Sequence, residues 1–124
     1  MKLKQIEIEI SSLKESLDRA AEVMEKISRG EPVKTRRILS FVTIDLMRKF
    51  LTPERLKLMG IIRRQKPKSI YALAKLAKRD AKSVNTDVKV LADLGIIRLK
   101  KIKSRKNRYI PTVSFDKINV GIEL

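Results

Sequence analysis

Hydrophobic positions alternate with charged ones at the start of the chain. From Lys4 to Ile10 an isoleucine stands at every second position, which is typical of a half-buried strand. Ser12 then stands three residues before Glu15, the spacing of a capping box at the start of a helix. Apolar residues follow at alternating steps of four and three, so they form one stripe on a helix of about 16 residues. The stripe consists of Leu13, Leu17, Ala20, Met24 and Ile27.

The middle of the chain contains the signals of several further elements. Residues 38–44 are apolar and rich in β-formers, which predicts a strand or extended link, and a short helix follows up to Phe50. Thr52, Pro53 and Glu54 are a hydroxyl cap, a proline at the first helical position and an acid at the positive end of the helix dipole. They predict the start of a broadly apolar, buried helix.

Two more helices and a hairpin are predicted after it. Ser69 caps a short helix, Asp80 caps a helix over residues 81–94, and Gly95 is the expected stop. Residues 96–102 and 109–113 then form the strands of a β-hairpin with its turn at 104–107. The order of helix, helix, short turn, helix and hairpin is that of a winged helix-turn-helix domain.

The helix over 81–94 separates into two faces on a helical projection. Val84, Val88 and Leu91 lie on the inward face. The opposite face consists of side chains that suit both phosphates and base edges, namely Lys82, Ser83, Asn85, Thr86 and Lys89. The alternative is a basic face that is merely solvated. Asp87 lies beside the buried face, where a structural salt bridge with a basic residue is favoured over contact with a cytosine.

Composition restricts the possible chemistry. The 124 residues include no cysteine and no histidine, which excludes disulfide scaffolds, Cys/His zinc sites, thiol nucleophiles and histidine acid–base catalysis. We also find no acid–base pair and no glycine-rich phosphate loop, so we expect no enzyme, no metal and no cofactor. Because no run of 18 apolar residues exists, we expect a cytoplasmic protein without a membrane partner.

The net charge of +16 points to a polyanionic partner, and it is concentrated in one segment. Residues 52–113 carry 18 basic and 4 acidic groups, whereas residues 1–51 have a net charge of only +3. Basic residues that serve only solubility would be spread along the chain. We therefore interpret this segment as a surface that binds double-stranded DNA. The basic hairpin can lie on the phosphate backbone or enter the minor groove. The candidate DNA contacts are Lys68, Ser69, Tyr71, Arg79, Lys82, Ser83, Asn85, Thr86, Lys89, Lys100, Lys103, Arg105, Lys106 and Arg108.

Three stretches carry a resemblance to a known family: residues 51–56 (Leu-Thr-Pro-Glu-Arg-Leu), 79–84 (Arg-Asp-Ala-Lys-Ser-Val) and 87–95 (Asp-Val-Lys-Val-Leu-Ala-Asp-Leu-Gly). With them the chain resembles MarR-like winged-helix transcriptional regulators, which are mainly archaeal, over nearly its whole length. The resemblance implies a dimeric DNA-binding regulator, expected to be a repressor. It also covers antitoxins that bind their own operator and neutralise a toxin. The hairpin departs from the family in its many basic residues and its lack of a glycine turn.

The fold class expected is α+β, with three parts. Residues 1–51 form a strand–helix module, residues 52–113 the winged helix-turn-helix domain, and residues 114–124 a strand that returns to the module. The alternating residues 118–124, the opening strand and residues 38–44 can build a small sheet covered by the long first helix. We expect this module to form a homodimer or to dock a protein partner, and its helix stripe could be the seam. Two recognition helices would then lie about 34 Å apart on DNA. The candidate dimer or partner contacts are Ile6, Ile8, Leu13, Leu17, Met24 and Ile27.

Three other functions are alternatives to a transcription regulator. An antitoxin fits the same features, and the adjacent reading frame or a co-purifying protein would separate the two. An RNA-binding or architectural protein is disfavoured because base stacking needs exposed aromatic residues, and the chain has only five aromatic residues. An enzyme is the weakest alternative.

Overall fold

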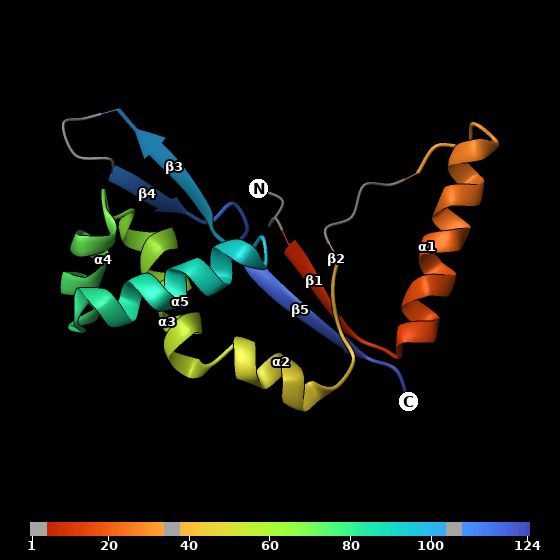
Figure 1. Ribbon diagram of the computed structural model, residues 1–124, viewed down its shortest axis with the longest axis horizontal. Coiled ribbons are helices and arrows are strands. Elements are labelled where there is room, and N and C mark those ends of the chain that lie inside the picture. Colours follow the sequence, from red (N-terminus) through yellow and green to blue (C-terminus); the bar gives the residue numbers. More distant parts are fainter. Residues whose placement is uncertain (1–4, 34–37, 104–107) are drawn as a thin grey trace. The chain divides into compact units, whose positions relative to one another are not determined.

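The chain belongs to the α+β class and divides into two compact units (Figure 1). The computed structural model describes residues 5–33, 38–103 and 108–124. Residues 1–49 and 115–124 form one unit, here called the terminal unit, and residues 50–114 form the central unit. Leu51 is buried and belongs to the central unit, whereas the sequence suggested that it closes the first module.

A three-stranded parallel sheet is the centre of the terminal unit. The elements are β1 (Gln5–Ile10), α1 (Leu13–Ser28), β2 (Ile38–Phe41), α2 (Ile44–Phe50), which leads into the central unit, and β5 (Lys117–Ile122). The strand order is β2-β1-β5, and β1 runs parallel to both neighbours. The sequence prediction that these three segments form one sheet is confirmed. Their parallel direction was not predicted.

The alternation in β1 divides the sheet into two faces. Ile6, Ile8 and Ile10 are all buried, whereas Glu7 and Glu9 on the opposite face are partly exposed. This corrects one expectation. Ile6 and Ile8, predicted to contact a dimer mate or partner, are only 4% and 0% exposed within a single chain. They therefore belong to the internal core.

Helix α1 begins with the predicted capping box, in which Ser12 and Glu15 each bond the other's backbone N–H. The expectation that its apolar stripe covers the sheet is wrong. Leu13, Leu17, Met24 and Ile27 are each 60% exposed or more, and no residue of α1 is buried. The helix instead contacts β1 through its charged side, where Arg19 pairs with Glu9.

The central unit combines three helices with an antiparallel hairpin. It contains α3 (Pro53–Gln65), α4 (Ile70–Ala77), α5 (Ala81–Asp93), β3 (Arg98–Ile102) and β4 (Arg108–Thr112). Helix α5 packs against α4 and α3, and β4 contacts both α3 and α4. The predicted helices and hairpin strands are confirmed, while the predicted turn at 104–107 lies outside the described residues. The buried core consists of Leu51, Leu58, Met59, Ile61, Ile62, Leu73, Ala74, Val84, Val88, Leu91, Ile96, Ile97 and Pro111.

Side-chain caps fix where these helices begin. Thr52 Oγ1 accepts from the Arg55 N–H at 3.3 Å, and Ser69 Oγ accepts from the Ala72 N–H at 2.9 Å. An Asp80 carboxylate oxygen accepts from the Ser83 N–H at 3.1 Å. All three caps were predicted from the sequence. These bonds satisfy N–H groups that have no partner inside the helix, so they determine the residue at which each helix begins.

Candidate nucleic-acid interface

Helix α5 presents one apolar and one polar face. Val84, Val88 and Leu91 are fully buried, which confirms the inward face predicted from the sequence. On the other face four side chains are exposed and Asn85 is partly buried. The exposed ones are Lys82, Ser83, Thr86 and Lys89. The structure thus leaves ammonium, hydroxyl and amide groups on the outer surface of a 13-residue helix.

Local hydrogen bonds hold part of this polar face in place. Thr86 Oγ1 donates to the Lys82 carbonyl at 3.1 Å, one helical turn earlier. The Ser83 hydroxyl lies 3.5 Å from Arg79 Nη2. A hydroxyl that donates to its own helix keeps lone pairs for an incoming donor. Thr86 is therefore oriented as an acceptor toward solvent.

Asp87 forms an ion-pair cluster beneath that face. One carboxylate oxygen is 3.0 Å from Arg55 Nε and the other is 2.8 Å from Arg79 Nη2. The Asp87 and Arg55 side chains are only 14% and 15% exposed, so water screens the pair weakly. Arg55 also donates to the Phe50 carbonyl at 2.9 Å. The predicted structural salt bridge is confirmed, and it ties α3 and the turn before α5 to α5.

The structure assigns structural roles to two of the candidate DNA contacts. Arg79 pairs with Asp87, and its Nη1 is buried without a hydrogen-bond partner. Its guanidinium is therefore part of the packing beneath α5. Ser69 uses its hydroxyl to cap α4. The Ser69 cap was predicted from the sequence, whereas the direction of the Arg79 side chain could not be predicted from it.

The basic residues of the hairpin lie on two faces. Arg98 stands opposite Thr112, and Ile102 stands opposite Arg108. Because paired residues share a face and faces alternate along a strand, Arg98, Lys100 and Arg108 all lie on one side. Leu99, Lys101 and the buried Pro111 lie on the other. Arg98 belongs to the basic hairpin identified from the sequence, although it was not among the candidate contacts.

The remaining candidates lie at three places. Lys68 is exposed before α4, and Tyr71 is 63% exposed on α4. The Lys75 ammonium lies 4.8 Å from the centre of the Tyr71 ring, a cation–π contact at the i, i+4 spacing that could have indicated Lys75. Lys103 is exposed just beyond β3. Arg105 and Lys106 lie outside the described residues.

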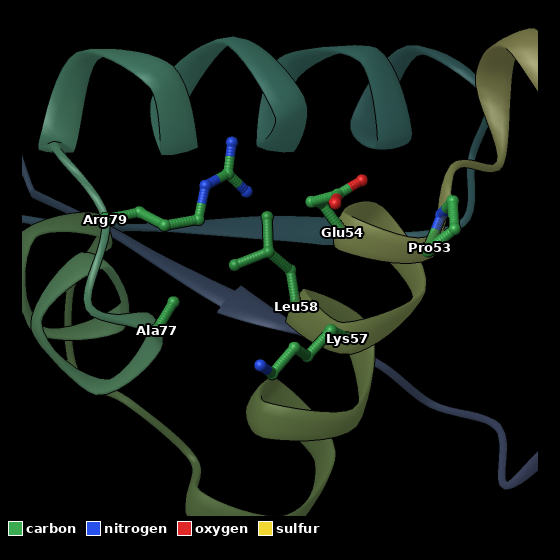
Figure 2. A pocket seen from close by; sticks show the side chains of 6 residues that line it. All are labelled: Pro53, Glu54, Lys57, Leu58, Ala77 and Arg79. Atoms are coloured by element: carbon green, nitrogen blue, oxygen red, sulfur yellow. The ribbon is translucent and has the colours of Figure 1, made fainter.

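A small pocket beside the cluster does not suit a cofactor. Its volume is about 250 Å³, below the roughly 300 Å³ at which small-molecule sites begin. Figure 2 shows the Arg79 guanidinium between α5 and the Leu58 side chain, with Glu54 nearby. Within the described ranges no group of three or more Asp or Glu residues could hold a metal ion. The pocket is lined by Pro53, Glu54, Lys57, Leu58, Ala77 and Arg79.

Comparison with known proteins defines a family. A model of the HVO_A0114 family matches residues 50–120, which is more than half of the chain. The chain belongs to the HVO_A0114 family. The match spans the whole central unit and reaches into β5, so the polar face of α5 and the basic hairpin both lie within the HVO_A0114 segment. Among curated proteins none matches the chain. In the described part of the chain, no helix has both the length and the apolar character to span a bilayer.

Proposed function

We propose that this chain is a double-stranded-DNA-binding transcription regulator of the winged helix-turn-helix type. The observation that carries the proposal is the exposed face of α5, where Lys82, Thr86 and Lys89 lie and which contains no acidic residue before Asp93, because Asp87 lies beneath it. That face belongs to a unit whose 65 residues include 18 basic and 4 acidic groups. One of these acids, Asp87, is already paired with two arginines.

The connection between α4 and α5 supports this type of domain. Only three residues, 78–80, separate the two helices. Lys78 adopts the left-handed conformation at φ 55°, which turns the chain sharply, and Asp80 then caps α5. A turn of three or four residues between two helices is the geometry that places a second helix in a major groove. Helix α5 is about 20 Å long, enough to lie along such a groove.

The two groups of polar residues would have different tasks. Asn85 and Thr86 present an amide and a hydroxyl, which can hydrogen-bond to base edges, and Lys82 can reach guanine or phosphate. Arg98, Lys100 and Arg108 share one side of the hairpin and would contact the phosphate backbone or the minor groove. The helix would then supply sequence preference and the hairpin most of the salt-dependent affinity.

Binding of the full chain to a panel of fluorescent duplexes over a range of salt concentrations tests the proposal. Replacing Asn85 or Thr86 with alanine should change affinity by different factors on different sequences, about 5- to 100-fold where a base contact is lost. Lys100→Ala and Arg108→Ala should weaken all duplexes alike and lower the salt slope by about one unit each.

Lys101→Ala is the matched control, because Lys101 is exposed on the same strand but lies on the opposite face from Lys100. It should lower the salt slope by clearly less than Lys100→Ala does. Equal losses on every sequence from the α5 variants would reduce the function to non-specific binding. Absence of binding to any duplex at low salt would reject the proposal.

A further inference from the structure

Helix α1 is oriented with its apolar side away from the rest of the terminal unit. Leu13, Leu17, Met24 and Ile27 are 60–70% exposed, and they share one side of the helix with Ala20 and Ala21. Every charged residue of α1 lies outside this stripe. Single exposed hydrophobic residues are ordinary on protein surfaces, but four on one stripe of a helix mark an interaction site.

Specific contacts on the charged side of α1 fix this orientation. Arg19 pairs with Glu9 of β1, and its Nη2 donates to Ser11 Oγ at 2.6 Å. The Ser16 and Ser11 hydroxyls are 3.1 Å apart. The helix is thereby attached to the end of β1 by its polar side, and its apolar stripe has no partner among the described residues of the terminal unit.

We propose that α1 pairs antiparallel with α1 of a second copy of this chain, the two helices crossing at Ala20. The positions in the stripe are symmetric about that residue. Leu13 and Ile27 lie equally far on either side of Ala20, and Leu17 and Met24 do so to within one residue. A two-fold axis through Ala20 therefore places large apolar side chains of one copy against large apolar side chains of the other. The small side chains of Ala20 and Ala21 allow the helices to approach closely at the centre.

The charges at the edge of the stripe select the antiparallel direction. Lys14 and Glu25 are eleven residues apart, which is about three full turns, so they stand on the same edge. Their midpoint also falls beside Ala20. Across the two-fold axis Lys14 of each copy consequently faces Glu25 of the other, forming two ion pairs. In a parallel pair the two-fold axis would instead place the Lys14 and Glu25 edges of the two copies on opposite sides of the seam, so neither ion pair would form.

A second copy fits this surface better than a membrane or a nucleic acid. Helix α1 has a net charge of −1 in a chain whose net charge is +16. Helices that lie on membranes carry lysine and arginine on their polar face, whereas the polar face of α1 contains four acids and three bases. The pairing also brings together the nearly neutral parts of two strongly positive chains. This inference is independent of the proposed function.

Sedimentation equilibrium of the nuclease-treated full chain, without DNA, is the direct test. The wild type should have twice its 14.3 kDa chain mass at micromolar concentration. Lys14→Glu and Glu25→Lys should each raise the dissociation constant of the dimer by about tenfold or more, because each places two like-charge pairs across the axis. The double variant should return the constant to within about threefold of the wild type, because it restores both ion pairs in reversed order.

Glu22→Lys is the matched control, since it makes the same charge change at an exposed position of α1 outside the stripe. It should leave the mass unchanged. Far-UV circular dichroism confirms that each variant keeps its helices. A wild-type chain that stays monomeric overturns the proposal, including the case in which it binds a different protein or a lipid vesicle instead. The antiparallel pairing is overturned if the dimer of the double variant has a higher dissociation constant than the dimers of both single variants.

Discussion

The Asp87 carboxylate pairs with two arginines from different parts of the central unit. It accepts from Arg55, which enters from α3, and from Arg79, which stands in the turn before α5. Both of its oxygens are within 3.0 Å of a guanidinium nitrogen, and its side chain is 14% exposed. Without this charge two arginines would lie close together in a poorly hydrated place. Asp87 therefore attaches α5 to α3 and to the turn before α5, on the side beneath the polar face.

Replacing Asp87 with asparagine should destabilise the central unit by about 3 kcal/mol, because two partly buried guanidinium groups lose their counter-charge. Urea unfolding of the full chain, followed by circular dichroism, measures the change in the free energy of unfolding. Asp93→Asn removes the same charge from an exposed position on the same helix and should change that free energy by less than about 0.5 kcal/mol. A similar loss from both variants would indicate a general charge effect instead of the cluster.

The cap of α4 allows the stability of the fold and the proposed DNA binding to be tested separately. Ser69 was a candidate DNA contact as well as a predicted cap, and its hydroxyl accepts from the Ala72 N–H and caps α4. A capping role needs an acceptor at this position, whereas a phosphate contact needs a donor. Serine can satisfy both requirements, and aspartate can satisfy only the first.

Ser69→Ala should therefore lower the free energy of unfolding by about 1 kcal/mol, and Ser69→Asp should retain the wild-type value to within a few tenths. Thermal or urea unfolding of both variants provides the measurement. Duplex binding of Ser69→Asp then reports on the second role, because a carboxylate at a phosphate contact repels DNA. If Ser69→Asp unfolds as easily as Ser69→Ala, the cap does not account for the serine.

Elements defined by local signals could be predicted closely. The capping box at Ser12, the cap and proline at Thr52 and Pro53, and the Gly95 stop at φ +78° depend on neighbouring residues alone. The buried and polar faces of α5 also followed from helical periodicity. Local signals and periodicity likewise predicted the hairpin strands and most residues of the candidate interface.

Features that depend on distant partners could not be predicted in the same way. The parallel direction of β1 and β5 depends on how residues more than one hundred positions apart meet. The apolar stripe of α1 was visible, but the Arg19 contact that turns it outward is tertiary. Arg79 was expected among the DNA contacts, and only its distance to Asp87 reveals its structural role.

The positive charge of the molecule is concentrated in one of its two units. The central unit has a net charge of +14, while the terminal unit has 12 basic and 10 acidic groups and hence a net charge of only +2. Two central units repel one another, so self-association is favoured through the nearly neutral terminal unit. Under the two proposals, such an organisation brings two DNA-binding surfaces together without joining them directly.

The combination of the two proposals makes a prediction about DNA affinity. Ala20→Glu places a charge at the crossing point of the α1 pair and should give a monomer with an unchanged central unit. Its affinity for a duplex carrying one half-site should stay within about threefold of the wild type. Its affinity for a duplex carrying an inverted repeat should fall by about tenfold or more, because the second contact is no longer intramolecular.

Titrations with duplexes selected from a random library, at one fixed salt concentration and with several half-site spacings, measure both affinities. Glu22→Lys again serves as the control, since it changes the charge of α1 outside the apolar stripe. Equal losses of Ala20→Glu on both duplexes would mean that α1 acts on DNA binding by a route other than dimerisation. A selective loss on the inverted repeat would instead show that the apolar side of one helix determines how many recognition helices act together on one site.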